Sequence, residues 1–220
     1  MEIEAKFGLP DRATLERLRQ VGHLGGYRLG EGKVREVRDV YLDTADRRIL
    51  AAGHTCRWRE AAGQVVVTLK SLSPGQGAVR RREELEMALP AGAPLDPSQW
   101  PPSPARERLA GWIRTEPPCP LFELHQTRTV RPVFRKESKV AEMSLDEVRA
   151  TAGGRAHEYL ELEIELQAQG NADDLAALVD VLTRERELAA EPRSKFERAL
   201  AMLDHSSPAS LLLSSEQETL

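Results

Sequence analysis

The sequence is poor in cysteine and lacks any long apolar run. Its two cysteines, Cys56 and Cys119, show neither CxxC nor Cys/His spacing, so we expect neither a disulfide framework nor a zinc site. No run of about 18 apolar residues occurs, and the N-terminus lacks the pattern of a secretory leader. We therefore expect no membrane span and no secretion, and a cytoplasmic location.

The chain also lacks a dominant charge. It has 31 basic and 35 acidic residues, which gives a net charge of -4. This balance produces no global field that would attract the protein to nucleic acid or to an anionic membrane. We expect neither as a partner, so the charge of any ligand must be inferred from local clusters.

Charged and apolar residues alternate at the N-terminus. Glu2, Glu4 and Lys6 are separated by Ile3 and Ala5. Successive side chains of a strand point to opposite faces, so this stretch predicts a strand with one charged and one apolar face. The whole chain, with 40% hydrophobic and 30% charged residues, is apolar enough to bury a core.

Similar strand patterns follow along the chain, with few helices between them. Apolar spacing and capping residues predict helices after Asp11, Ser103 and Asn171 and another from Ser194. About eight strands without βαβ alternation favour an α+β, mainly antiparallel fold, a sheet or closed barrel with flanking helices. The predicted strands lie at 2–7, 34–43, 54–61, 64–70, 78–89, 121–134, 139–148 and 157–167.

The charged faces of these strands separate acids from bases. Neighbouring like charges on one sheet face repel, so they need counter-ions or a functional reason. Carboxylate clusters suit Mg²⁺ or Mn²⁺, and clusters of Arg and Lys suit phosphoryl oxygens. A barrel that enclosed the charged face would form a site for a metal-bound polyphosphate. The aligned sets are Arg57 and Arg59; Thr68 and Lys70; Arg82, Glu84 and Glu86; Glu142, Ser144 and Asp146; and Glu161, Glu163 and Glu165.

The order of these motifs resembles the CYTH superfamily, the triphosphate tunnel metalloenzymes. Glu2–Lys6 matches the family signature ExExK. The resemblance runs from residue 1 to about 203 and implies a single domain with an eight-stranded antiparallel tunnel; we expect residues 204–220 to form a disordered tail. The other matching motifs are "YLD", "CRWRE", "TLK", "REELE", "TRTV", "SLDE", "LELEIEL" and "SKFERAL".

The resemblance also implies roles for individual residues. Metal ligands would be Glu2, Glu4, Asp146, Glu161 and Glu163, with Mg²⁺ or Mn²⁺ as the cofactor. The bases Lys6, Arg57, Arg59, Lys70, Arg82, Arg128 and Lys195 would contact the triphosphate. The catalytic set would be Glu2, Glu4, Lys6, Glu163 and Lys195, whereas Glu84 and Glu86 would hold a second metal or orient the bases. Gln126 stands where the family often has a base, which would weaken one phosphate contact.

Several functions stay open on this scaffold. The first hypothesis is metal-dependent hydrolysis of tripolyphosphate to pyrophosphate and phosphate. Thiamine triphosphatase and class IV adenylyl cyclase relatives share the same motifs, and a polyphosphate-binding module without turnover is a further alternative.

A structural alternative leaves the charged faces exposed to solvent. If they instead line a tunnel, we expect Glu4→Gln to relieve repulsion and raise the melting temperature without metal. The oligomeric state would be a monomer or a homodimer.

Overall fold

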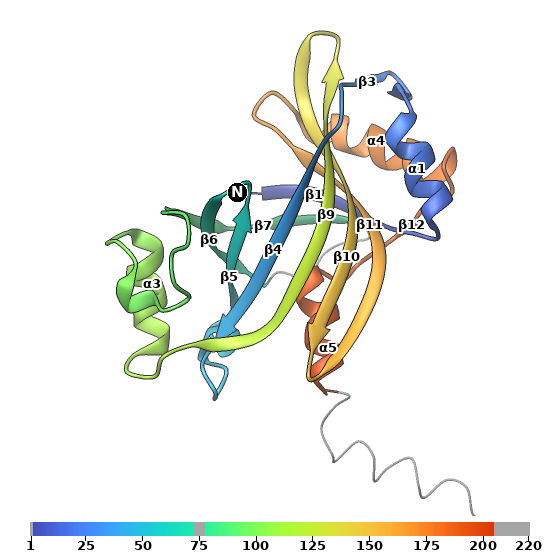
Figure 1. Ribbon diagram of the computed structural model, residues 1–220. Helices are drawn as coiled ribbons and strands as arrows, with labels where there is room; N and C mark the ends of the chain where they lie inside the picture. The colour runs from blue at the N-terminus through green and yellow to red at the C-terminus, as the bar shows by residue number, and fades with distance from the viewer. Residues whose placement is uncertain (1, 73–77, 205–220) are drawn as a thin grey trace, which may run out of the picture.

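The computed structural model describes residues 2–72 and 78–204, and nearly half of these residues form antiparallel strands (Figure 1). Five α-helices accompany the strands within these ranges. The helices are α1 (Arg12–Gln20), α2 (Arg48–Ala51), α3 (Pro104–Ile113), α4 (Ala172–Arg184) and α5 (Lys195–Asp204). The strands are β1 (Glu2–Leu9), β2 (His23–Leu24), β3 (Tyr27–Leu29), β4 (Lys33–Asp43), β5 (His54–Ala61), β6 (Gln64–Ser71), β7 (Val79–Arg82), β8 (Glu84–Leu89), β9 (Cys119–Arg135), β10 (Ser138–Ala152), β11 (Arg155–Leu166) and β12 (Ala189–Ala190).

The main strands follow one another around a strongly curled sheet. Their order is β1-β11-β10-β9-β4-β5-β6-β8, and β7 pairs with the free side of β1. Because only Glu83 separates β7 from β8, the segment from Val79 to Leu89 joins the two ends of the sheet. The predicted antiparallel barrel is therefore confirmed, with "eight-stranded and closed" as an approximation for a sheet that has twelve strand segments within the described ranges.

The segment 78–89 differs from its prediction as a single strand. It breaks at Glu83 because its two halves have different neighbours. Arg82 is aligned with Glu2 of β1, whereas Glu84 is aligned with Lys70 of β6. A segment that closes a barrel between two diverging strands cannot hydrogen-bond to both along its whole length, and the sequence pattern does not reveal this change.

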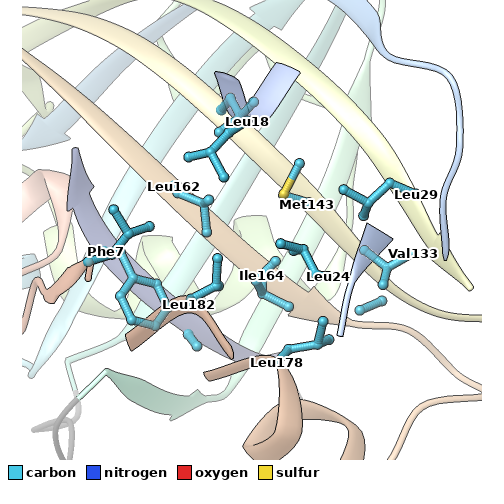
Figure 2. Packing of buried hydrophobic residues seen from close by; sticks show 14 of the residues in the cluster. Phe7, Leu18, Leu24, Leu29, Val133, Met143, Leu162, Ile164, Leu178 and Leu182 are labelled. Atoms are coloured by element: carbon cyan, nitrogen blue, oxygen red, sulfur yellow. The ribbon is translucent and has the colours of Figure 1, made fainter. Parts of the chain in front are cut away.

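The outer face of the sheet carries two apolar cores under helices. α1 and α4 cover β1, β11 and β10, with Phe7, Leu162 and Ile164 packed beneath Leu18 and Leu178 (Figure 2). On the opposite side, α3 covers the outer face of β4, β5, β6 and β8. Their apolar residues alternate with the charged ones along the strands, so the charged residues face inward. A third apolar cluster packs Phe122, Leu124 and Val148 against Phe196 of α5.

Capping residues begin the helices where the sequence predicts. The Asp11 carboxylate accepts a hydrogen bond from Thr14 N at 2.7 Å, and Ser103 Oγ accepts one from Arg106 N at 3.1 Å. Asn171 and Asp174 exchange hydrogen bonds as a capping box. None of the helices in the described ranges combines the length and apolar character needed to cross a bilayer. The predicted disordered tail falls on 205–220, which lie outside the described residues, and α5 includes Asp204.

Candidate functional site

The inward face of the sheet forms one charged cavity of about 200 Å³. Twelve of the fourteen site residues predicted from the sequence line it: Glu2, Glu4, Lys6, Arg57, Arg59, Lys70, Arg82, Glu84, Glu86, Arg128, Glu163 and Lys195. The remaining two, Asp146 and Glu161, do not line it, but they are fully buried and contact Lys195, which does. Glu4 and Lys6 are only 4% and 2% exposed, so the alternative of solvent-exposed charged faces is wrong.

Acids and bases of β1, β6 and β7 pair at one wall of the cavity. Lys70 Nζ donates to Glu2 Oε1 at 2.9 Å and also forms an ion pair with Glu84. Arg82 donates to Glu4, and its Nη2 lies 3.4 Å from Glu2 Oε2. Glu2 and Glu4 thus each meet a base, and this pairing opposes the repulsion among carboxylates that the sequence predicts for Glu4.

A second group brings together β9, β10, β11 and the start of α5. Carboxylate oxygens of Asp146, Glu161 and Glu163 lie within 4.8 Å of one another. Lys195 Nζ lies 2.9, 2.7 and 2.8 Å from these three acids, respectively. Arg128 donates to both oxygens of Asp146 and to Glu163, at 2.6–2.7 Å. α5 thus delivers a cation into an acid cluster built by two neighbouring strands.

These contacts shift the protonation equilibria of the buried groups. Burial acts to raise the pKa of Glu163, but Lys195, Lys6 and Arg128 outweigh it and hold that pKa well below its ordinary value. The acids likewise hold the pKa of Lys195 well above its ordinary value, against the effect of burial. Glu163 is consequently a carboxylate and Lys195 an ammonium at neutral pH.

Glu165 lines the same cavity in different surroundings. Burial and the negative charge of Glu2 raise its pKa to about 7. Glu163 and Glu4 act in the same direction, and only Lys70 opposes them among the main influences. This side of the cavity has an excess of acid that a cation would relieve.

The carboxylates fit a hard divalent cation. Oxygen ligands from several carboxylates are what Mg²⁺ and Mn²⁺ prefer. Glu2 Oε2 and Glu161 Oε2 are buried and accept no hydrogen bond from the described residues. They therefore retain acceptor capacity toward a metal, in keeping with the assignment of both residues as metal ligands.

Arg59 and Arg57 have different environments on β5. Arg59 donates to Asp39 through Nε at 2.6 Å and Nη2 at 2.7 Å, and Gln126 Nε2 donates to the same carboxylate at 2.7 Å. Gln126, at the position where the resemblance implied a base, is thus buried as a neutral partner of Asp39. Arg57 has no carboxylate within ion-pair distance among the described residues and donates only to Thr68 Oγ1, at 3.2 Å. Arg57 Nε is buried without a hydrogen-bond partner among the described residues, so the guanidinium retains donor capacity.

The structure adds residues that sequence analysis did not assign to the site. Tyr41, Phe122 and Phe196 pack with ring centroids 5.0–5.4 Å apart, and the first and last of them line the cavity. Arg80 shares the inward face with Arg82 and is buried, but it pairs with Glu197 of α5 and does not line the cavity. Strand alternation predicts the direction of Arg80, whereas the aromatic group depends on the docking of α5.

A curled antiparallel sheet that encloses a cavity lined by paired acids and bases defines a charged tunnel. The chain belongs to the CYTH domain family, whose sequence profile matches residues 1–200. The comparison with curated proteins finds no match.

Solved structures share this fold at low sequence identity. A candidate adenylyl cyclase from Hippeastrum with a dominant triphosphatase activity is 20% identical, with a TM-score of 0.69 over 92% of this chain and 97% of that one. A candidate adenylate cyclase from Bacillus halodurans is 18% identical, with a TM-score of 0.60 over 90% and 96% of the two chains. A protein of Pyrococcus horikoshii is 19% identical, with a TM-score of 0.59 over 92% and 99%. At these identities the likeness supports the fold alone.

Proposed function

We propose that the protein is a metal-dependent inorganic triphosphatase that hydrolyses tripolyphosphate to pyrophosphate and phosphate. The observation that carries the proposal is a single cavity in which carboxylates of β1 and β11 face bases of β5, β6 and β9. Bases complement phosphoryl oxygens, and carboxylates complement the cation that accompanies them. Membership of the CYTH family, which includes triphosphatases, supports the same class of activity.

The size of the cavity favours an inorganic substrate. Pockets for larger organic ligands usually measure about 300–1,000 Å³ and are mainly apolar. This cavity measures about 200 Å³, and nearly all the residues around it are polar or charged. Tyr41 and Phe196 offer an aromatic surface, but only 6% and 4% of their surfaces are exposed. A nucleobase or thiazolium ring would therefore find little stacking surface inside.

Different residues of the chain would bind the substrate and stabilise the charge that develops during hydrolysis. Arg57, Arg59 and Arg128 would hold phosphoryl oxygens in fixed orientations, because guanidinium groups donate in a planar fork. Lys6 and Lys195 would stabilise the charge that develops on the transferred group. Mg²⁺ or Mn²⁺ held by Glu2, Glu4, Asp146, Glu161 and Glu163 would neutralise phosphate charge and lower the pKa of a bound water. Glu84 and Glu86 would orient Lys70 and Thr68, which they contact, or support a second cation.

A substrate comparison tests this proposal. Tripolyphosphate, ATP and thiamine triphosphate are supplied at equal concentrations of free Mg²⁺ or Mn²⁺, and phosphate release and cyclic AMP are measured. The proposal expects the highest kcat/KM with tripolyphosphate and no cyclic AMP. Tripolyphosphate as the poorest substrate would refute the substrate assignment, and cyclic AMP from ATP would indicate a cyclase. Tight polyphosphate binding by calorimetry without turnover in any metal would indicate the binding module.

A further inference from the structure

Two further basic residues lie on β4 beyond the residues that line the cavity. Lys33 and Arg35 occupy alternate positions with Asp39, so they share its inward face. Arg35 is aligned with Arg128 of β9, which lines the cavity. Residues directly opposite in an antiparallel pair have Cβ atoms about 4.5–5.5 Å apart. Arg35 and Lys33 do not line the cavity themselves, so they are further bases on the same face of the sheet.

Arg35 lacks the compensation that most inward-facing bases have. Within the described residues it makes no ion pair, whereas Arg59 and Arg128 are both paired with acids. Partial burial and the charge of Arg128 hold the pKa of Arg35 below its ordinary value, against the opposing effect of Glu142. Like charges directly opposite each other on a sheet are destabilising. The position thus has an excess of positive charge that an external anion would relieve.

The start of β4 is open on the side away from β9. Pairing between β4 and β5 begins at Val37, so residues 33–36 have β9 as their only strand neighbour among the described residues. Lys33 and Arg35 are both exposed. Both side chains are therefore open to an anion from solvent.

We propose that Arg35 and Lys33 form a subsite for additional phosphoryl groups of a linear polyphosphate whose terminal groups occupy the cavity. The subsite rests on the proposed function, and it makes chains longer than tripolyphosphate the preferred ligands. Each further phosphoryl unit brings another negative charge to the uncompensated bases.

The neighbouring residues favour polyphosphate over single-stranded nucleic acid. Sites for single-stranded nucleic acid combine bases with aromatic surfaces on which nucleobases stack. Beyond Arg128, the next inward-facing positions of β9 are Val130 and Pro132, which provide no such surface. These two positions therefore offer no platform for a base next to Lys33 and Arg35.

Binding measurements in EDTA test the subsite without turnover. Dissociation constants of tripolyphosphate and of a long linear polyphosphate are measured by calorimetry for the wild type, Arg35→Gln and Arg38→Gln. Arg38 lies on the outer face of β4 and pairs with Glu123, so Arg38→Gln removes the same charge from the opposite face. Arg35→Gln should weaken binding of the long chain about fivefold and change that of tripolyphosphate less than about twofold.

Each other outcome overturns the subsite. These outcomes are a wild type that binds the long chain no better than tripolyphosphate, equal losses for both chain lengths in Arg35→Gln, or an equal loss in Arg38→Gln. Stronger Arg35-dependent binding of a 5′-triphosphorylated oligonucleotide would replace polyphosphate with nucleic acid. Failure of the subsite can be told apart from failure of the proposed function. Arg35-dependent binding of the long chain without hydrolysis of tripolyphosphate refutes only the proposed function. Hydrolysis of tripolyphosphate, together with a chain-length preference that Arg35→Gln leaves unchanged, refutes only the subsite.

Discussion

At the scale of single residues, Asp39 shows how a buried acid fixes a base that lines the cavity. Its side chain is fully buried and accepts hydrogen bonds from Arg59 and Gln126. Burial acts to raise the pKa of Asp39, but the charge of Arg59 outweighs it and holds that pKa far below its ordinary value. The carboxylate fixes the Arg59 guanidinium in the orientation in which it faces the cavity.

Replacement of Asp39 by Asn should destabilise the protein. The change leaves Arg59 without its charged partner, and breaking a buried ion pair costs about 3–5 kcal/mol. Because the pKa of the Asp39 carboxyl is lower in the folded than in the unfolded protein, its ionised form stabilises the fold at any pH above the unfolded-state pKa of about 3.9. This stabilisation disappears as the pH falls from there toward the folded-state pKa. Urea denaturation should therefore show a large deficit at pH 7 that shrinks below about pH 4. A deficit independent of pH would contradict the assignment to charge.

The pairing of Glu4 leads to a second prediction. Glu4→Gln removes the charged partner of Arg82 and a neighbour of Lys6. A loss of about 1–2 kcal/mol should lower the melting temperature by about 2–6 °C in EDTA. Glu60→Gln, on the outer face of β5, is the matched control and should have little effect. A higher melting temperature for Glu4→Gln would mean that carboxylate repulsion dominates this wall.

At the scale of elements, α5 completes the site. Its first turn carries Lys195 into the acid cluster, and Glu197 accepts hydrogen bonds from Ser194 N and Oγ while pairing with Arg80 of β7. Further along, the Arg198 guanidinium lies 3.5 Å from the centroid of the Tyr159 ring and 3.2 Å from Glu191. The orientation of Lys195 therefore depends on contacts that are not themselves part of the cavity.

Glu197→Gln should loosen the start of α5. The variant loses the ion pair with Arg80 and weakens the hydrogen bonds to Ser194 that fix the first turn. Amide hydrogen exchange should accelerate in α5 while remaining unchanged in α1, and tripolyphosphate binding should weaken severalfold through Lys195. Glu16→Gln in α1 is the control. Unchanged exchange in α5 would show that Lys195 alone positions the helix.

Sequence patterns predict most elements here because alternation and capping are local properties. Alternation in β1 and β11 predicts which residues face the cavity, and Asp11, Ser103 and Asn171 mark helix starts. The sequence does not predict the break at Glu83, which depends on where β1 and β6 diverge. It also does not predict β2, β3 and β12, because two or three residues are too few to show a period.

The site also combines features that local sequence patterns predict with features that depend on contacts between distant strands. Motif order predicts the inward-facing acids and bases, but not which acid contacts which base. Sequence analysis places Glu165 on the charged face without a role, and it does not select Asp39 and Arg35, although their alternation places them inward. Their surroundings depend on the curvature of the sheet, which brings strands that are distant in sequence together.

At the scale of the whole molecule, metal and anion should bind cooperatively. In the structure, the assigned metal ligands Glu2, Asp146 and Glu163 are paired with the assigned phosphate-binding bases Lys70, Arg128 and Lys195. A cation that binds the carboxylates breaks these ion pairs and leaves the bases available to an anion. An anion that binds the bases likewise leaves the carboxylates available to a cation. Such coupling is reciprocal, so each ligand must raise the affinity of the other by the same factor.

Calorimetry with an imido analogue of tripolyphosphate measures this coupling. We expect Mg²⁺ to strengthen binding of the analogue by about tenfold, and the analogue to strengthen Mg²⁺ binding equally. Free concentrations of both ligands are held fixed, because they also bind each other in solution. Independent binding of the two ligands would contradict exchange of partners within the cavity.

The most direct test of the central claim is metal-dependent phosphate release from tripolyphosphate. The wild type, Glu4→Gln and the outer-face control Glu60→Gln are compared in Mg²⁺, Mn²⁺ and EDTA, after circular dichroism confirms that all three are folded. If the charged cavity is a triphosphatase site, the wild type and Glu60→Gln release phosphate only with metal, and Glu4→Gln loses at least about 100-fold in kcat/KM. No release by the folded wild type in either metal, or equal release by Glu4→Gln, would contradict it.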